Sequence, residues 1–384
     1  MSKQILEGSH AVAEIIKRLD VGVVSAYPIT PQTHIVEDLE KMKADAEAEF
    51  EYIRAESEFA AASIVLGSSA TGVRTYTATC SQGLLLMAEV LYCIAGMRLP
   101  VVLTCANRAV SAPISIWNDQ QDAVTVRDSG WIQLYGETSQ EVVDLHILAY
   151  KLGEKMQLPV IVNMDGFILT HTYEPVEIPS PEKIKKFLPT YKPDKDRILD
   201  TNNPRSLGTF APPDQYMEIR QELFEDLKKS QAEIKKLAAE FKKAFNRNLG
   251  SNGLIEEYKT KDAEIVLVAM GSVCGTIKEV VDQQRKKGKK VGLLKIISFR
   301  PFPDEEIIKS LSKVKYIAVI DKSISCGTEG VLASDIKRAA YKKLNAKIQS
   351  FIVGLGGRDV SQKVIGKVVT QVKESGNSVR FVNN

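Results

Sequence analysis

A single hydroxyl side chain lies between two prolines near the start of the chain, in the stretch Pro28-Ile29-Thr30-Pro31. The apolar run before it, residues 21–26, is short and rich in valine, which predicts a buried strand. Pro31 suits the first position of a helix, and Thr30 would cap that helix by accepting a hydrogen bond from a backbone N–H. Anionic ligands bind at helix N-termini along the carboxyl edge of parallel sheets. Thr30 is therefore either a helix cap alone or a cap that also contacts a ligand.

The cysteines and the glycine-rich segments do not indicate a metal site or a nucleotide site. The five cysteines are scattered, without a C-x-x-C pair or a spacing suited to zinc or an iron-sulfur cluster, so we expect each to be a small core residue. They are Cys80, Cys93, Cys105, Cys274 and Cys326. Two glycine-rich segments, residues 271–275 and 354–359, match neither the P-loop pattern nor the dinucleotide fingerprint, and we expect tight turns there. The missing fingerprint counts against a nicotinamide-dependent dehydrogenase.

The elements that must position these residues alternate between strand and helix. An alanine-rich helix follows Glu58, and a turn at residues 80–83 precedes an apolar helix at 84–96. A second α/β unit begins near residue 262, with helices opening near Val273, Asp304 and Thr328. The alternation predicts parallel sheets covered on both faces. The expected strands are residues 21–26, 73–79, 99–106 and 158–164, then 263–270, 290–297, 315–321 and 347–354.

The middle of the chain differs in character. Proline is frequent and strands are not expected over residues 179–213, which we interpret as an arm wrapped over the first domain. Residues 215–245 have apolar positions at steps of three and four, which predicts an amphipathic helix. We prefer a surface helix to a coiled coil, because the heptad is irregular.

Length and composition set broad limits. A chain of 384 residues predicts two domains, and 44% hydrophobic and 26% charged residues are typical of a globular protein. The 51 basic and 48 acidic residues nearly balance, which gives no electrostatic footprint for nucleic acid. The sequence has neither a membrane-spanning run nor the apolar stretch of a signal peptide, so we expect a cytoplasmic protein without membrane partners.

Several motifs occur in the order found in one enzyme family. They are AYPITP, RAESEFAAAS, TATCSQGLLLMAE, ANRAVSAPISIWNDQQD, FRPFP and GLGGRD. The chain resembles alpha subunits of 2-oxoacid:ferredoxin oxidoreductases, most closely the multi-subunit pyruvate enzyme. The resemblance implies a domain at 1–250 similar to the doubly wound pyrimidine-binding domain of thiamine diphosphate enzymes. It also implies a smaller domain at 251–384 similar to the C-terminal α/β domain of transketolases.

The resemblance gives Glu58 a role in catalysis and cofactor binding. Thiamine diphosphate reacts through C2, and its activation requires a carboxyl group beside N1′ of the aminopyrimidine. The family pattern matches that acid to Glu58. The alternative is an exposed glutamate in the first turn of the helix, a description that suits Glu56 better.

The resemblance also implies a substrate site. The matching threonine and arginine, Thr30 and Arg108, hold the 2-oxoacid, and the planar fork of arginine suits a carboxylate. Taken alone, Arg108 would more often be a surface ion-pair residue. Ile114 and Ile116 resemble an apolar wall beside the substrate side chain, although core packing explains them equally well.

The sequence lacks parts that the reaction needs. No Gly-Asp-Gly sequence for Mg²⁺ and diphosphate occurs, and Met164-Asp165-Gly166 is the nearest approach. The resemblance implies a beta subunit that binds the diphosphate, Mg²⁺ and a [4Fe-4S] cluster. It also implies a ferredoxin-like delta subunit that carries clusters, and a gamma subunit that takes part in coenzyme A binding.

The expected reaction is reversible oxidative decarboxylation of pyruvate with coenzyme A, giving acetyl-CoA and CO₂ and passing electrons to ferredoxin. The alternatives are another substrate, namely a branched-chain 2-oxoacid, 2-oxoglutarate or oxalate, or a non-catalytic α/β scaffold subunit.

Overall fold

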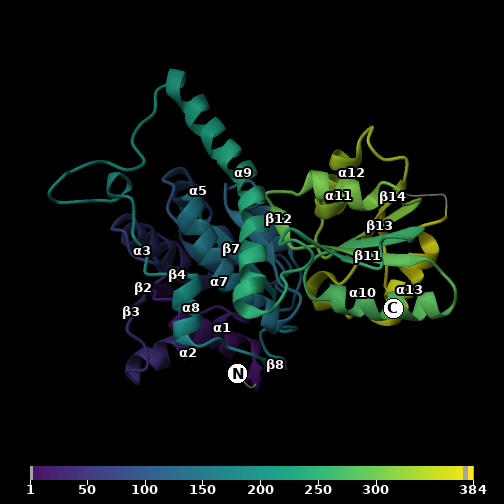
Figure 1. Cartoon of the computed structure of the whole chain (residues 1–384), viewed down its shortest axis with the longest axis horizontal. Helices are drawn as coiled ribbons and strands as arrows, with labels where there is room; N and C mark the ends of the chain where they lie inside the picture. The colour runs from purple at the N-terminus through teal and green to yellow at the C-terminus, as the bar shows by residue number, and fades with distance from the viewer. Residues whose placement is uncertain (1–2, 375–378, 384) are drawn as a thin grey trace.

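The computed structural model of the chain describes residues 3–374 and 379–383 and contains two sheet-centred units side by side, with the long helix α9 (Pro213–Phe245) between them (Figure 1). Each unit is a sheet with helices on its faces. The α/β fold class predicted from the sequence is therefore confirmed.

The first unit is built on a seven-stranded sheet of order β12-β6-β7-β5-β4-β2-β3. All neighbouring strands pair in parallel except β12, which is antiparallel to β6. Every residue of β4, β5 and β7 is buried, because helices cover both faces of the sheet. The strands are β2 (Val23–Ala26), β3 (Glu51–Arg54), β4 (Thr75–Thr79), β5 (Val102–Asn107), β6 (Ile132–Tyr135), β7 (Val160–Asp165) and β12 (Ser298–Arg300). The helices are α1 (Gly8–Lys17), α2 (Thr33–Ala44), α3 (Glu58–Ala70), α4 (Ser81–Leu86), α5 (Ala88–Gly96), α6 (Gln121–Thr125) and α7 (Ser139–Met156).

The second unit is a six-stranded sheet of order β15-β14-β13-β10-β11-β9, parallel except for β9. Its strands are β9 (Ile255–Tyr258), β10 (Ile265–Ala269), β11 (Val291–Ile296), β13 (Tyr316–Asp321), β14 (Lys347–Ile352) and β15 (Val379–Phe381). Its helices are α10 (Val273–Lys286), α11 (Asp304–Leu311), α12 (Val331–Ala340), the short 3₁₀ helix η2 (Leu355–Gly357) and α13 (Gln362–Gln371). Each glycine-rich segment begins with the predicted tight turn, with φ of +77° at Gly271 and +67° at Gly354, but residues 273–275 already belong to α10 and residues 355–357 form η2.

The segment between the units is an arm followed by a surface helix, in agreement with the sequence. The arm contains α8 (Pro181–Phe187) and the 3₁₀ helix η1 (Lys195–Arg197) and no strand over residues 179–213. The amino-terminal half of α9 extends away from the first unit, whereas its carboxyl-terminal half packs its apolar face (Figure 1). A separate two-stranded antiparallel sheet joins β1 (Gln4–Glu7) to β8 (Tyr173–Val176).

Three details differ from the sequence-based expectations. The predicted turn at residues 80–83 is already helical from Ser81, where α4 begins, and Met87 separates α4 from α5. Seven short strands were not expected, namely β1, β3, β6, β8, β9, β12 and β15. β12 lies in the second half of the sequence but completes the first sheet, so the predicted division at 250/251 stays a prediction.

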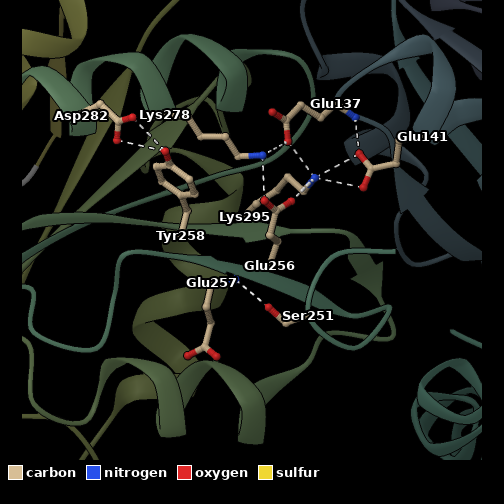
Figure 2. Close-up of polar contacts among 9 residues, drawn as sticks. All are labelled: Glu137, Glu141, Ser251, Glu256, Glu257, Tyr258, Lys278, Asp282 and Lys295. Carbon is tan, nitrogen blue, oxygen red and sulfur yellow. Dashed lines mark hydrogen bonds and ion pairs between the residues drawn. The ribbon is translucent and has the colours of Figure 1, made fainter. Parts of the chain in front are cut away.

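A buried ion cluster joins the two units (Figure 2). The ammonium group of Lys295 on β11 is 2% exposed and lies 2.7 Å from Glu137, 3.0 Å from Glu141 and 2.6 Å from Glu256. Lys278 on α10 lies 2.7 Å from Glu137 and 2.8 Å from Glu256. Glu137 and Glu141 belong to the first unit and the other three residues to the second, so the cluster fixes one unit against the other.

Candidate active site

Thr30 and Arg108 follow two parallel strands of the first sheet, β2 and β5, and therefore lie at the same sheet edge. The structure brings them together, because Nη1 of Arg108 donates a 2.8 Å hydrogen bond to the carbonyl oxygen of Thr30. Nε of Arg108 donates to the carbonyl of Ser115 at 2.9 Å. Arg108 is only 6% exposed, and among the described residues no carboxylate lies within ion-pair distance of its guanidinium. It is therefore not the surface ion-pair residue that its type alone would suggest.

Thr30 does not cap a helix, which corrects the sequence-based expectation. Helix α2 begins at Thr33 and its N-cap is Gln32. The buried Gln32 closes a turn: its side-chain oxygen accepts from the Ile29 N–H at 3.2 Å, and its N–H donates to the Ile29 carbonyl at 2.8 Å. Thr30 and Pro31 lie within this turn, so the helix begins at Thr33 and not at Pro31 as predicted. The hydroxyl of Thr30 is exposed at the sheet edge and is available to a ligand.

Glu58 is the first residue of α3, and Ser57 caps that helix by accepting from the Ala60 N–H at 3.2 Å. Glu58 is 7% exposed, whereas Glu56 is exposed, as the sequence predicted for these two acids. Within residues 3–374 and 379–383, no hydrogen bond or ion pair reaches the Glu58 carboxylate. The carboxylate oxygens of Glu58 are not among the fully buried, unpartnered polar atoms of the described chain, so the carboxyl group stays accessible to a ligand that could pair with it.

Gly83 forms a close backbone approach to Glu58. A Cβ atom at Gly83 would lie 2.6 Å from Oε1 of Glu58, so no other residue type fits there without displacing the carboxyl group. The neighbouring hydroxyl of Thr79 is buried and has no hydrogen-bond partner among the described residues. These features fit a bound group with polar atoms beside Glu58, as the aminopyrimidine of thiamine diphosphate has.

Asp122 organises this edge and was missed by sequence reasoning. Its buried carboxylate accepts from the backbone N–H of Ser81 at 2.8 Å, from that of Arg108 at 2.9 Å and from the side-chain amide of Asn107 at 3.1 Å. Burial raises the pKa of Asp122, and the donated hydrogen bonds oppose the rise. The only signal in the sequence was the polar run at residues 118–122, which could not be assigned partners.

Ile114 and Ile116 lie on the loop that Arg108 holds at Ser115. They are 79% and 39% exposed, which excludes the core-packing interpretation. Their proposed role as an apolar wall beside a substrate stays a prediction.

Asp165 is not a free metal ligand, although it belongs to the nearest approach to a Gly-Asp-Gly sequence. Its carboxylate accepts from the backbone N–H of Ser272 at 3.0 Å and from Gln120 at 3.2 Å, and it pairs with Lys322 at 3.4 Å. Burial would raise the pKa of Asp165, but Lys322 and the donated hydrogen bonds lower it. Its lone pairs are therefore used between the two units, and the residues here do not fit a magnesium diphosphate site.

The cysteine prediction was correct for three of the five positions. Cys80, Cys105 and Cys274 are buried, whereas Cys93 and Cys326 are exposed and are not core residues. Cys93 lies on the outer surface of α5, and Cys326 lies in the loop before α12. Their exposure follows from these positions, although cysteine is usually a buried residue type.

Comparisons with known proteins agree with this geometry. Residues 14–239 match the family described as pyruvate flavodoxin/ferredoxin oxidoreductase, thiamine diphosphate-binding, and residues 263–365 match pyruvate:ferredoxin oxidoreductase core domain II. The chain is 49% identical to pyruvate synthase subunit PorA of Methanocaldococcus jannaschii over 375 residues, covering 97% of this chain and 95% of that protein. It is 42% identical to ketoisovalerate oxidoreductase subunit VorA of Pyrococcus horikoshii over 378 residues, covering 97% and 95%.

A solved structure has the same fold. It is the 2-oxoglutarate:ferredoxin oxidoreductase from Magnetococcus marinus, with a TM-score of 0.75 at 19% identity. The match covers 97% of this chain and 66% of that one. From the matched families and these identities, the chain belongs to the pyruvate:ferredoxin oxidoreductase family.

Proposed function

We propose that the chain is the alpha subunit of a thiamine diphosphate-dependent pyruvate:ferredoxin oxidoreductase. The complex catalyses reversible, coenzyme A-dependent oxidative decarboxylation of pyruvate to acetyl-CoA and CO₂. The observation that carries the proposal is the buried carboxyl group of Glu58, which has no partner in the described chain and faces the backbone of Gly83. A scaffold subunit has no need of such a group.

Glu58 acts on a proton in this proposal. Bound thiamine diphosphate supplies a nucleophilic carbon, C2, once its proton has been removed. Glu58 shares a proton with N1′ of the aminopyrimidine, which lies within hydrogen-bond reach of the carboxyl group in this proposal. Gly83 allows the backbone to pass close to the carboxyl group, and this fixes its position.

Arg108 binds the substrate carboxylate. Two of its guanidinium nitrogens donate to the carbonyls of Ser115 and Thr30, which fixes the plane of the fork. Its Nη2 has no hydrogen-bond partner in the described part of the chain, so this side of the guanidinium is left for an anion. The Thr30 hydroxyl donates to the oxoacid from the adjacent turn, and Ile114 and Ile116 contact the substrate methyl group.

Partner subunits complete the site. Exposed apolar side chains occur on the elements that form this edge: Tyr27 after β2 is 38% exposed, Phe59 beside Glu58 is 40% exposed, and Leu86 on α4, the helix that contains Gly83, is 51% exposed. An apolar rim of this kind favours a protein interface. A beta subunit supplies Mg²⁺, the diphosphate site and a [4Fe-4S] cluster, a delta subunit supplies further clusters, and a gamma subunit takes part in coenzyme A binding.

The assembled heterotetramer passes electrons to ferredoxin in anaerobic metabolism in the cytoplasm. Among the described residues, no helix is long and apolar enough to cross a bilayer.

A branched-chain 2-oxoacid is the second candidate substrate, favoured by the 42% identity to the VorA subunit. Turnover of pyruvate, 2-oxoisovalerate, 2-oxoglutarate and oxalate by the purified complex separates the candidates. We expect the largest kcat/KM with pyruvate, and a larger value with 2-oxoisovalerate would reassign the substrate.

The decisive experiment changes Glu58 to Gln, which keeps the shape of the side chain and removes its proton. We expect Glu58→Gln to assemble and bind cofactor but to slow C2 hydrogen–deuterium exchange, followed by NMR, by roughly 100-fold or more. Glu56→Gln is the matched control, because Glu56 lies two residues away and is exposed. Normal exchange in Glu58→Gln would assign the activating acid elsewhere and remove the main support of the proposal.

A further inference from the structure

Three side chains with metal-binding atoms meet away from the proposed active site. They are Glu7 at the end of β1, His34 in the first turn of α2, and His171 just before β8. One ligand atom from each lies within 4.8 Å of the other two. Two imidazoles and one carboxylate are a donor set that binds Zn²⁺ and leaves a coordination position open.

Backbone pairing holds two of these segments together. β1 pairs with β8 in a register that sets Glu7 opposite Tyr173, two residues beyond His171. The next residues continue the contact, because the backbone N–H of Ser9 donates to the Thr170 carbonyl at 3.0 Å. The N-terminal segment lies beside β8 in Figure 1. The ligand positions are therefore fixed by main-chain hydrogen bonds and not by a mobile loop.

The histidines are oriented by second contacts. Nδ1 of His171 lies 2.7 Å from the hydroxyl of Thr170, which is fully buried and accepts from the Phe167 N–H at 2.7 Å. This leaves Nε2 of His171 for a metal, and a hydrogen bond from the other ring nitrogen is the usual support of a metal-binding histidine. Nδ1 of His34 lies 2.7 Å from the Glu7 carboxylate, so these two donors are already adjacent.

Stacked rings connect this cluster to the loop beside Arg108. The ring centroids of His34 and His171 lie 4.6 Å apart, those of His171 and Phe167 4.7 Å, and those of Phe167 and Trp117 4.7 Å. Trp117 follows Ile116 in the sequence. A metal that fixes the two imidazoles would therefore also fix one side of that loop.

We propose that Glu7, His34 and His171 form a binding site for a divalent transition metal, best suited to Zn²⁺, with water in the open position. The inference is independent of the proposed function. A second histidine–carboxylate pair in the chain serves as a control for a contact that binds no metal. His10 lies 2.9 Å from Asp38 and belongs to no group of three metal-binding side chains among the described residues.

The test is equilibrium dialysis of the purified complex against buffered free Zn²⁺, with zinc measured by elemental analysis. We expect wild type to bind one zinc per chain. The affinity for zinc should fall at least about 100-fold in His171→Gln and in Glu7→Gln, because each substitution removes a ligand. His10→Gln should bind like wild type. Differences between variants separate this zinc from any held by partner subunits.

A thermal measurement guards against misfolded variants. In excess chelator, the thermal midpoint of Glu7→Gln should lie within about 2 °C of wild type, because it loses only the half-exposed contact with His34. Added Zn²⁺ should raise only the wild-type midpoint. If wild type and His171→Gln take up the same zinc at every concentration, or if His10→Gln loses as much as His171→Gln, the site does not exist.

Discussion

Removing the ammonium group of Lys295 should strongly destabilise the chain. In Lys295→Met, the three carboxylates of Glu137, Glu141 and Glu256 remain partly or fully buried. Lys278 still pairs with Glu137 and Glu256, but Glu141 loses its ammonium partner (Figure 2). Breaking a buried pair from one side costs about 3–5 kcal/mol, because it leaves buried charge without compensation.

The expected change in melting temperature follows from chain length. At about 2.1 cal/mol/K per residue, the unfolding entropy of a 384-residue chain is roughly 0.8 kcal/mol/K. The loss of free energy of unfolding then lowers the midpoint by roughly 4–6 °C if the units unfold together. Scanning calorimetry at pH 8 measures this. Lys315→Met is the matched control, because Lys315 is 72% exposed and pairs with Glu264 at 3.5 Å, so its loss should cost less than about 1 kcal/mol.

The same variant should change the pH dependence of stability. Burial alone would raise the pKa of Glu256, but Lys295 and Lys278 outweigh burial and lower it below the ordinary value of 4.5. A lowered carboxyl pKa adds stability that is complete above the unfolded-state pKa and is lost as the pH falls through the folded-state pKa. Without Lys295, burial dominates and favours protonated carboxyl groups, so the deficit relative to wild type should shrink as the pH falls from about 8 to about 5. A deficit that does not change with pH, or a midpoint within about 1 °C of wild type at pH 8, would show that water already screens the cluster.

Four further outcomes concern the active site and its cofactor. Arg108→Lys keeps the charge but loses the fork, so kcat/KM for pyruvate should fall while C2 exchange remains; unchanged kcat/KM would leave Arg108 a structural role only. Gly83→Ala should slow C2 exchange by displacing the carboxyl group of Glu58, and normal exchange would mean that the site has room to adapt. Thr30→Ala should lower activity without lowering the free energy of unfolding by the roughly 1 kcal/mol that loss of a helix cap costs. Steady-state kinetics and thermal midpoints of the variant distinguish a ligand contact from a helix cap. The chain purified without partners should bind thiamine diphosphate and Mg²⁺ no tighter than about 100 μM by calorimetry, since micromolar binding, worth about 8 kcal/mol, would require ligands that this chain lacks.

Buried strands were the most predictable part of the fold. In the second unit, β10, β11, β13 and β14 each lie within the residues predicted, because buried parallel strands are rich in apolar residues. The apolar run is weakest in β14, which also contains Lys347, Gln349 and Ser350. Most of the strands that were missed lack this signal, although the four residues of β6 are all buried. β3 is an edge strand with charged and largely exposed residues, and the three residues of β12 are a strand only because β6 lies beside them.

The parts of the site that lie at the ends of strands could be predicted from the sequence. The parts whose conformation depends on contacts between distant residues could not. Arg108 and Thr30 follow strands of one parallel sheet, so their proximity follows from topology. The predicted start of helix α2 was too early in the sequence. A turn closed by Gln32 precedes the helix, and the side-chain amide of Gln32 is held by a 2.6 Å hydrogen bond to the carbonyl of Ala78, 46 positions away. Proline and threonine patterns report only local preferences, and a contact of this range outweighs them.

The polar run at residues 118–122 links the second unit to the active-site edge. Asp122 holds the backbone N–H of Arg108, while the N–H of Gln120 donates to the Lys322 carbonyl at 2.8 Å and Asp119 accepts from the Gly356 N–H at 3.0 Å. Burial raises the pKa of Asp119 to about 6, against the hydrogen bonds donated to it. This five-residue segment therefore positions Arg108, the proposed substrate-binding residue, and is itself held by the turns of the second unit that contain Lys322 and Gly356. Because these contacts share one segment, we expect a change at the unit interface to reach Arg108 without any contact to a ligand. The second unit should therefore influence the proposed reaction, although none of the proposed substrate-binding residues lies in it.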